Sequence, residues 1–209
     1  MFDSFKKAFA AAAAVVVTGA AAVVAIPMIT TEEPRACPSS IVIGVGGNQD
    51  GQSEVFKDTA DIRVQYSGKL NDVERGISAL KKEVDDFRAE CPDSRLILSG
   101  FSQGAAITHI YLSRHGHEIK DKAHAVLYSD PKMHPTGESN GLFLIGGSPV
   151  AGTDKNYGGV PTSSICRLDD IICNRTASSG WIGFLFLGNH MRYDFDPRKW
   201  DRVVGHHYL

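Results

Sequence analysis

Clusters of positive charge are absent from this sequence. Its 22 lysines and arginines are scattered among 24 aspartates and glutamates, and the formal net charge is −2. Proteins that bind nucleic acids through the phosphates carry a basic patch or stripe, so no nucleic-acid partner is expected. Internal repeats are also lacking, and low-complexity sequence is confined to the N-terminal segment. The 209 residues, 43% of them hydrophobic, predict one globular domain that is long enough to bury a core.

Long apolar runs are lacking too, apart from one near the N-terminus. Lys6 and Lys7 precede an almost unbroken apolar stretch over residues 8–26. A short basic region followed by such a stretch is typical of an export signal, here with small residues before a cleavage site after Ala25. An uncleaved membrane anchor is the alternative, because the stretch, continued to Ile29, approaches the roughly 20 residues of a membrane span.

This segment sets the domain organisation and the expected location. We interpret residues 1–26 as a signal peptide or N-terminal membrane anchor, residues 27–36 as a linker, and residues 37–209 as the folded domain. The protein is therefore expected to be secreted and extracellular. The anchor alternative would leave it associated with the membrane or the cell wall.

Cysteine is scarce, since Cys37, Cys91, Cys166 and Cys173 are the only four. They form no C-x-x-C motif, so a zinc cluster is not expected. An even number of cysteines in an exported chain predicts two disulfides, with buried free thiols as the alternative. Three pairings exist in principle. A bond between Cys166 and Cys173 would close a small loop and leave Cys37 to pair with Cys91.

Strand and helix patterns alternate along the rest of the chain. Apolar and β-branched runs predict strands at residues 39–45, 61–66, 94–99, 123–128 and 163–168. Apolar residues at spacings of four and three predict a helix from Val73 to Phe87, and a second helical pattern covers residues 105–113. Such alternation predicts an α/β fold with a mainly parallel sheet and helices on both faces. Ligands of these sheets bind at the carboxyl ends of the strands.

A GxSxG pentapeptide, Gly100-Phe101-Ser102-Gln103-Gly104, lies between a predicted strand and a predicted helix. This is the context of the strand–turn–helix elbow that lifts a serine hydroxyl out of a sheet. Side chains at positions 100 and 104 would collide with the neighbouring strand and helix, which explains the glycines. Ser102 is therefore the candidate nucleophile, and the N–H of Gln103, at a helix N-terminus, is a candidate oxyanion donor. A tight turn without chemistry is the alternative.

A serine nucleophile needs a histidine as base and a carboxylate to orient that histidine. In α/β-hydrolases the chain order is serine, acid, histidine. Of eight histidines, His190, His206 and His207 come late enough, and the last two lie at the end of the sequence, where chains fray. His190 is therefore the candidate base. The candidate acids are Asp169 and Asp170 after the last predicted strand, with Asp130 as a more distant alternative.

These residues resemble the cutinase family of serine esterases over about residues 37–193. Residues 91–105 (CPDSRLILSGFSQGA) are similar to the family's strand and GYSQGA elbow, with Phe101 in place of tyrosine. Residues 166–173 (CRLDDIIC) are similar to its C-x-x-x-D-x-x-C loop, in which the catalytic acid precedes the second cysteine by three residues. Residues 190–193 (HMRY) resemble the H-L-x-Y segment that holds the catalytic histidine.

The resemblance implies a catalytic triad of Ser102, Asp170 and His190, and it selects Asp170 over Asp169. It also implies the disulfides Cys37–Cys91 and Cys166–Cys173. The implied fold is a three-layer α/β-hydrolase sandwich with a mainly parallel five-stranded central sheet and no large lid.

Two segments depart from the family pattern. The first strand of the family ends in A-R-G-[ST], whose hydroxyl residue helps form the oxyanion hole, and this chain has Asn48 in that place. The backbone N–H and the side-chain amide of Asn48 can both donate, so Asn48 is the second candidate oxyanion residue beside Gln103. The stretch between Cys173 and His190 is also longer than in typical fungal members.

The sequence thus predicts a secreted serine esterase that acts on lipidic or polymeric esters without a metal or cofactor, as a monomer. An apolar segment, residues 181–187, precedes His190, and its Trp181, Phe184 and Phe186 are candidate substrate contacts. Burial of this segment against the sheet is the alternative. Two other functions stay open: a non-catalytic, membrane-anchored protein that binds lipid or cell wall on the same scaffold, and an esterase for mycolyl or acetyl esters of the cell wall.

Overall fold

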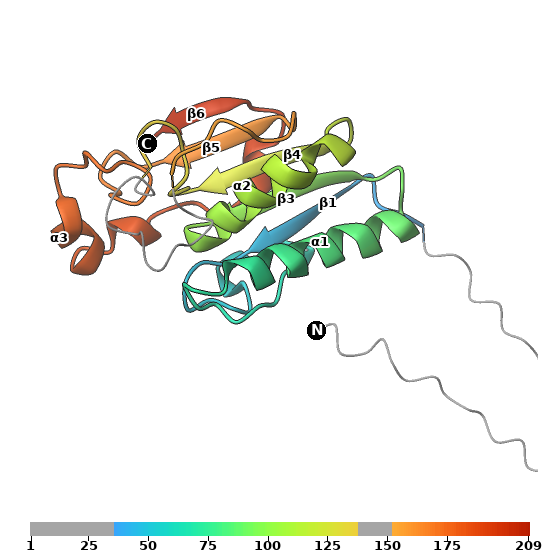
Figure 1. Ribbon diagram of the computed structural model, residues 1–209, viewed down its shortest axis with the longest axis horizontal. Coiled ribbons are helices and arrows are strands. Elements are labelled where there is room, and N and C mark those ends of the chain that lie inside the picture. Colours follow the sequence, from blue (N-terminus) through green and yellow to red (C-terminus); the bar gives the residue numbers. More distant parts are fainter. Residues whose placement is uncertain (1–35, 138–151) are drawn as a thin grey trace, which may run out of the picture. The chain divides into compact units, whose positions relative to one another are not determined.

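The computed structural model of this chain describes residues 36–137 and 152–209. Its centre is a six-stranded sheet in the order β2-β1-β3-β4-β5-β6, and every neighbouring pair is parallel (Figure 1). The strands are β1 Ser40–Val45, β2 Ile62–Arg63, β3 Arg95–Phe101, β4 Ala123–Tyr128, β5 Thr162–Cys166 and β6 Gly205–Tyr208. The α-helices are α1 Val73–Glu90, α2 Gln103–His115 and α3 Gly180–Leu185. The α/β fold with a parallel sheet is as expected.

The expected count of five strands is wrong, because β6 adds a sixth at the edge beside β5. Its sequence, Gly-His-His-Tyr, has no apolar run, and its residues alternate between half-buried and exposed. Such a sequence is tolerated because an edge strand needs to bury only part of one face. The second expected strand shrinks to two residues. Beyond Arg63 the N–H of Tyr66 donates to the carbonyl of Gly51 (3.0 Å) instead of to β1, so the chain leaves the sheet there.

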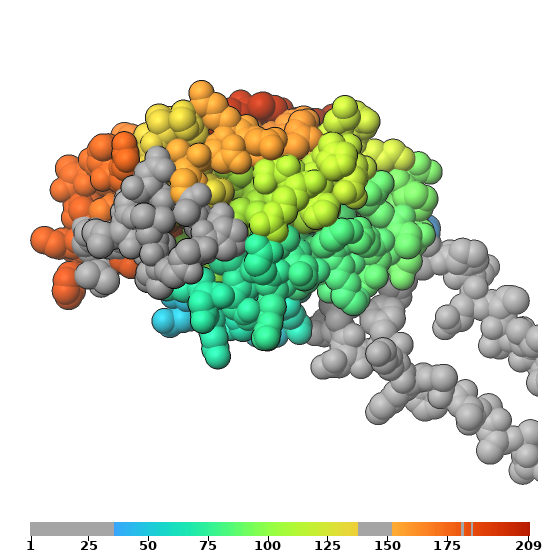
Figure 2. Space-filling view, viewed as in Figure 1, coloured from blue at the N-terminus to red at the C-terminus, as the bar shows by residue number. Residues whose placement is uncertain are grey.

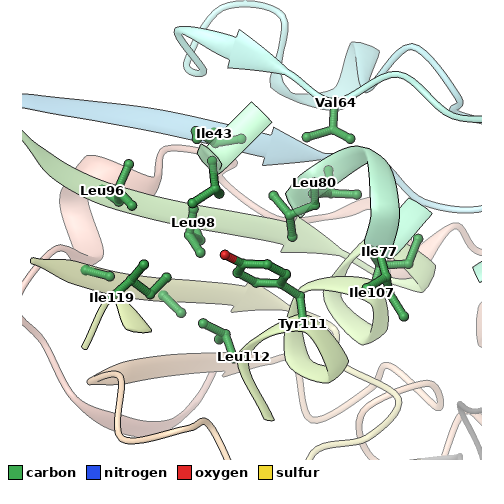
Figure 3. Packing of buried hydrophobic residues seen from close by; sticks show 14 of the residues in the cluster. Ile43, Val64, Ile77, Leu80, Leu96, Leu98, Ile107, Tyr111, Leu112 and Ile119 are labelled. Atoms are coloured by element: carbon green, nitrogen blue, oxygen red, sulfur yellow. The ribbon is translucent and has the colours of Figure 1, made fainter. Parts of the chain in front are cut away.

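Alternation along the strands divides the core between the two faces of the sheet. On one face, Ile43 and Leu98 pack against residues of α1 and α2, such as Leu80 and Tyr111, as Figure 3 shows. Helices α1 and α2 lie side by side over this face, which is also the face seen in Figure 2. They begin and end close to the expected positions.

The other face of the sheet is covered differently from the expected helical layer. Val42 and Ile97 point to this face and share a cluster with Phe56, Tyr193 and Phe195. The covering residues come from short 3-10 helices, η1 Glu54–Phe56 and η5 Pro197–Trp200, and from the segment before η5. Because this layer is built from short turns and aromatic side chains, the sequence has no helical periodicity that would predict it.

Two disulfides close the fold in the expected pairing. Cys37–Cys91 joins the residues before β1 to the end of α1, 54 positions apart. Cys166–Cys173 closes a loop of seven positions directly after β5. Among the described residues, 36–137 and 152–209, the structure contains no helix that could span a bilayer. The expected signal peptide or anchor, residues 1–26, and the linker up to residue 35 lie outside the described residues.

Candidate active site

A strained turn between β3 and α2 carries Ser102. Its backbone angles are φ 55° and ψ −118°, a combination that costs a non-glycine residue about 1–3 kcal/mol. The turn is tight enough to require both glycines of the motif. A Cβ on Gly104 would lie 2.1 Å from the carbonyl oxygen of Val45, and one on Gly100 would lie 2.4 Å from the carbonyl oxygen of Gly104. The expected elbow is therefore present.

The side chains of Ser102, His190 and Asp170 lie in one hydrogen-bonded row. Ser102 Oγ is 2.8 Å from His190 Nε2, and His190 Nδ1 is 2.9 Å and 3.1 Å from the two carboxylate oxygens of Asp170. An ionised carboxylate can only accept, so Nδ1 carries the imidazole proton and Nε2 is free to accept from the serine hydroxyl. The row therefore has the polarity that general-base activation of Ser102 requires.

Three separate parts of the chain bring these groups together. Ser102 follows β3, Asp170 lies in the disulfide-closed loop after β5, and His190 lies in the 3-10 helix η4, Asn189–Met191. The imidazole is held between aromatic rings, with the ring centroid of Phe101 at 4.7 Å and that of Phe184 at 5.1 Å. Because β3 and β5 are parallel, their carboxyl ends meet at the same edge of the sheet, as the sequence predicts.

Asp170 is buried and surrounded by donors. Tyr193 Oη donates to Asp170 Oδ2 (2.7 Å), and the backbone N–H of Ile172 donates to Oδ1 (3.0 Å). Burial by itself raises the pKa of Asp170, but the hydrogen bond and charge of His190, with the hydroxyls of Ser129 and Tyr193, outweigh it and keep the pKa below its usual value. The carboxylate is thus ionised and ready to stabilise an imidazolium.

The alternative acids and bases lie elsewhere. Asp169 pairs with Arg167 (Nε–Oδ1 3.0 Å). Asp130 is fully buried against His109 on α2. His206 and His207 belong to β6 rather than to a frayed end. The structure therefore brings Asp170 and His190, and none of these alternatives, to Ser102.

The candidate oxyanion region lies between the end of β1 and the start of α2. Gly47 approaches Ser102 so closely that a Cβ on Gly47 would lie 3.2 Å from Ser102 Cβ. Asn48 follows Gly47 and is exposed, and Gln103 is the first residue of α2. The two candidate donors thus belong to different parts of the chain: Asn48 follows Gly47, which approaches Ser102, and Gln103 directly follows Ser102.

Tyr66 supports this region, although the sequence alone does not single it out. Its hydroxyl donates to the carbonyls of Gly46 (2.8 Å) and Gly47 (3.1 Å). Burial, and to a lesser degree the charge of Asp50, raises the pKa of Tyr66, so the hydroxyl stays protonated and can donate. No local pattern marks Tyr66 in the sequence, because the contact joins segments 19 and 20 positions apart.

The apolar segment before His190 is largely at the surface. Ile182 is 67% exposed, Phe186 is 78% exposed and Phe184 is half-buried beside the imidazole. The backbone of Trp181 belongs to α3, and its side chain lies outside the described part of the structure. The expected alternative of a fully buried segment therefore does not hold for Ile182 and Phe186.

As for metals, the described residues contain no group of three His, Cys, Asp or Glu side chains that could hold an ion.

The two disulfides are expected to differ in their effect on activity. Loss of Cys37–Cys91, through Cys37→Ser with Cys91→Ser, should lower the free energy of unfolding by about 4 kcal/mol because it closes the longer loop. Loss of Cys166–Cys173 should lower it by only about 2 kcal/mol, yet reduce kcat more, since its loop carries Asp170. Urea unfolding and ester hydrolysis of both double variants, below their unfolding midpoints, check this. Equal kcat values would contradict a role of the smaller loop in placing the acid.

A parallel sheet with a nucleophile elbow after β3 defines a protein of the α/β-hydrolase class. The family model for cutinases matches residues 21–193, and the chain belongs to the cutinase family, a family of carboxylic ester hydrolases. A cutinase of Botryotinia fuckeliana is 27% identical over 148 residues, which make up 70% of this chain and 61% of the relative, so the chain spans less than two thirds of the relative's length.

Solved structures share the fold. A cutinase-like protein from Cryptococcus sp. superimposes with a TM-score of 0.52 at 18% identity, covering 77% of this chain and 98% of that one. The catalytic core domain of an acetyl xylan esterase from Trichoderma reesei superimposes with a TM-score of 0.51 at 18% identity, covering 81% and 96%.

Proposed function

We propose that this chain is a secreted serine esterase that hydrolyses carboxylic esters of lipidic or polymeric substrates through an acyl-enzyme. The observation that carries the proposal is the hydrogen-bonded row from Ser102 Oγ through His190 (2.8 Å) to Asp170 (2.9 Å). Membership of the cutinase family supports the same chemistry. The protein acts as a monomer and needs no metal or cofactor.

The reaction has two steps. In the first, His190 Nε2 takes the proton of Ser102, and Oγ attacks the ester carbonyl carbon. The tetrahedral intermediate collapses when the imidazolium returns that proton to the leaving alcohol. In the second step, His190 deprotonates a water molecule that attacks the acyl-serine; the tetrahedral intermediate then collapses with loss of the C–Oγ bond, the imidazolium returns its proton to Ser102 Oγ, and the carboxylic acid leaves. Asp170 holds the imidazole in the required tautomer and stabilises the imidazolium in both steps.

The oxyanion of each tetrahedral intermediate accepts from the N–H groups of Gln103 and Asn48. Gln103 supports this role by its place at the N-terminus of α2, where unpaired N–H groups concentrate positive potential. The role of Asn48 is supported by the close approach of the preceding residue, Gly47, to Ser102.

The surface near the proposed base supports this substrate class. Exposed apolar side chains, among them Phe186 and Met191, lie in sequence next to His190 and would contact an acyl chain or a lipid surface. Export is supported by the two disulfides, which persist in oxidising compartments. An N-terminal signal segment at residues 1–26 would direct it.

Hydrolysis of p-nitrophenyl esters of increasing acyl length tests the proposal. The full chain, produced by export so that its disulfides form, is expected to turn over these esters, with longer acyl chains favoured by the apolar surface. A serine-directed organophosphonate should label Ser102, as peptide mass spectrometry would show. A folded protein that neither turns over any ester nor takes up the label would favour the non-catalytic binding function. A strong preference for acetate would favour a glycan acetylesterase.

A further inference from the structure

Ser129, directly after β4, is fully buried and has an unusual backbone. Its φ is 51°, in the left-handed region that L-residues other than Asn and Asp seldom adopt and that glycine adopts without cost. Its N–H donates to the carbonyl of Ile165 in β5 (2.9 Å), which a glycine could do equally well. The backbone therefore favours glycine here, and the presence of a serine points to a task for its hydroxyl.

That hydroxyl faces the junction between the imidazole and the carboxylate. Ser129 Oγ is 3.1 Å from His190 Nδ1, the same nitrogen that faces both oxygens of Asp170. After His190, the same hydroxyl is one of the groups that keep the pKa of Asp170 below its usual value. A hydroxyl has one proton and two lone pairs. Since Nδ1 carries a proton and the carboxylate does not, the Ser129 hydroxyl can share the Nδ1 proton as an acceptor and can give its own proton to Asp170.

The turn at Ser129 is anchored on both sides. Asp130, the next residue, is fully buried, with Oδ2 2.6 Å from His109 Nδ1 and Oδ1 accepting from the N–H of Lys132 (2.9 Å). His109 belongs to α2, the helix that starts beside the nucleophile. The turn is thus fixed to β5, from which the acid loop departs, and to the helix that positions Ser102.

We infer that Ser129 is a positioning residue for the reaction, whose hydroxyl holds the His190 imidazole and the Asp170 carboxylate in one alignment while Nε2 faces Ser102. The inference rests on the proposed function of these three residues. On this inference, the left-handed backbone at Ser129 serves the reaction. The fold keeps a conformation that glycine would adopt more easily, because a serine there brings its hydroxyl to the imidazole of His190 and the carboxylate of Asp170.

Two substitutions separate the hydroxyl from the backbone. Ser129→Ala removes the hydroxyl and keeps the backbone strained, whereas Ser129→Gly removes it and relaxes the backbone. Ser99→Ala is the matched control, because Ser99 is also fully buried and its hydroxyl donates to a backbone carbonyl, that of Val126 (3.0 Å). The measurements are kcat and KM for a p-nitrophenyl ester and the urea midpoint of unfolding.

We expect kcat to fall about 10- to 100-fold in both Ser129 variants, the scale of one hydrogen bond to a charged group, with KM unchanged. Ser129→Gly should have a higher urea midpoint than Ser129→Ala, although it is equally slow. Ser99→Ala should lose stability and keep its kcat. A Ser129→Gly variant with the kcat of the parent would overturn the inference, as would a loss of kcat confined to Ser129→Ala.

A readout that does not depend on turnover separates this inference from the proposed function. The Nδ1 proton of His190 should give a downfield proton resonance, assigned by its disappearance in His190→Gln. This resonance is expected to shift in both Ser129 variants and to stay in place in Ser99→Ala. If the parent protein is inactive, the proposed function fails whatever the resonance does. If the parent is active and the resonance does not move in the Ser129 variants, the inference alone fails.

Discussion

Ser102→Ala is expected to lower kcat for ester hydrolysis by about 10⁶-fold, the scale of the loss when a serine nucleophile is removed from a triad. The substitution deletes the oxygen that attacks the carbonyl, and neither His190 nor Asp170 can replace it. The fold should persist, because alanine keeps the backbone of the elbow and loses only the 2.8 Å hydrogen bond to His190. Initial rates, organophosphonate labelling and circular dichroism of the purified variant check this.

A matched control is Ser113→Ala. Ser113 is also on α2, and its hydroxyl donates to the carbonyl of Ile110 (2.9 Å), away from the site. This variant should keep the rate of the parent and take up the label. If Ser102→Ala retained the turnover and the label, the nucleophile would have to be another residue.

Asp170→Asn is expected to lower kcat by about 10³–10⁴-fold. An asparagine presents an amide in place of the carboxylate, so it cannot stabilise the imidazolium and it allows the wrong imidazole tautomer. Tyr193 Oη, which donates to Oδ2 at 2.7 Å, would also lose a charged acceptor. The measurement is the kcat of Asp170→Asn and Asp169→Asn side by side.

Asp169→Asn should change kcat by less than about threefold. The Asp169 carboxylate pairs with Arg167 at a partly exposed position, where an ion pair contributes little. The two variants thus form a matched pair. Both lose one negative charge, and only Asp170→Asn also loses the carboxylate that contacts His190. A larger effect from Asp169→Asn than from Asp170→Asn would show that the acid has been misassigned.

The strands of the sheet could be predicted wherever burial requires a run of apolar residues. β1, β3 and β4 are fully or almost fully buried, and their apolar runs place them within one or two residues. β6 could not be predicted from the sequence, because an edge strand tolerates histidines. The segment that packs around η5 could not be predicted either, because its aromatic contacts follow no regular period. The elbow was predictable because steric necessity fixes its glycines.

The rest of the site depends on contacts between distant segments. The choice of Asp170 over Asp169 came from the family resemblance, since spacing alone treats neighbouring aspartates alike. Tyr193 lies in a segment that the resemblance singles out, but its bond to Asp170 becomes visible only in three dimensions. Ser129 meets His190 across 61 positions, and nothing local in the sequence indicates that its φ is positive.

The order of the strands has a consequence for the timing of synthesis. β1, β3 and β4 precede the acid loop and His190 in the chain, so a nascent polypeptide that has grown as far as β4 already contains the elbow with Ser102. It still lacks Asp170 and His190, the proposed acid and base. Domains fold largely as units while they emerge N-terminus first, and hydrolysis by this mechanism therefore begins only after the final part of the chain has been made and has docked beside β4. On the proposed mechanism, a growing chain that ends at β4 therefore carries Ser102 without the two residues that would activate it.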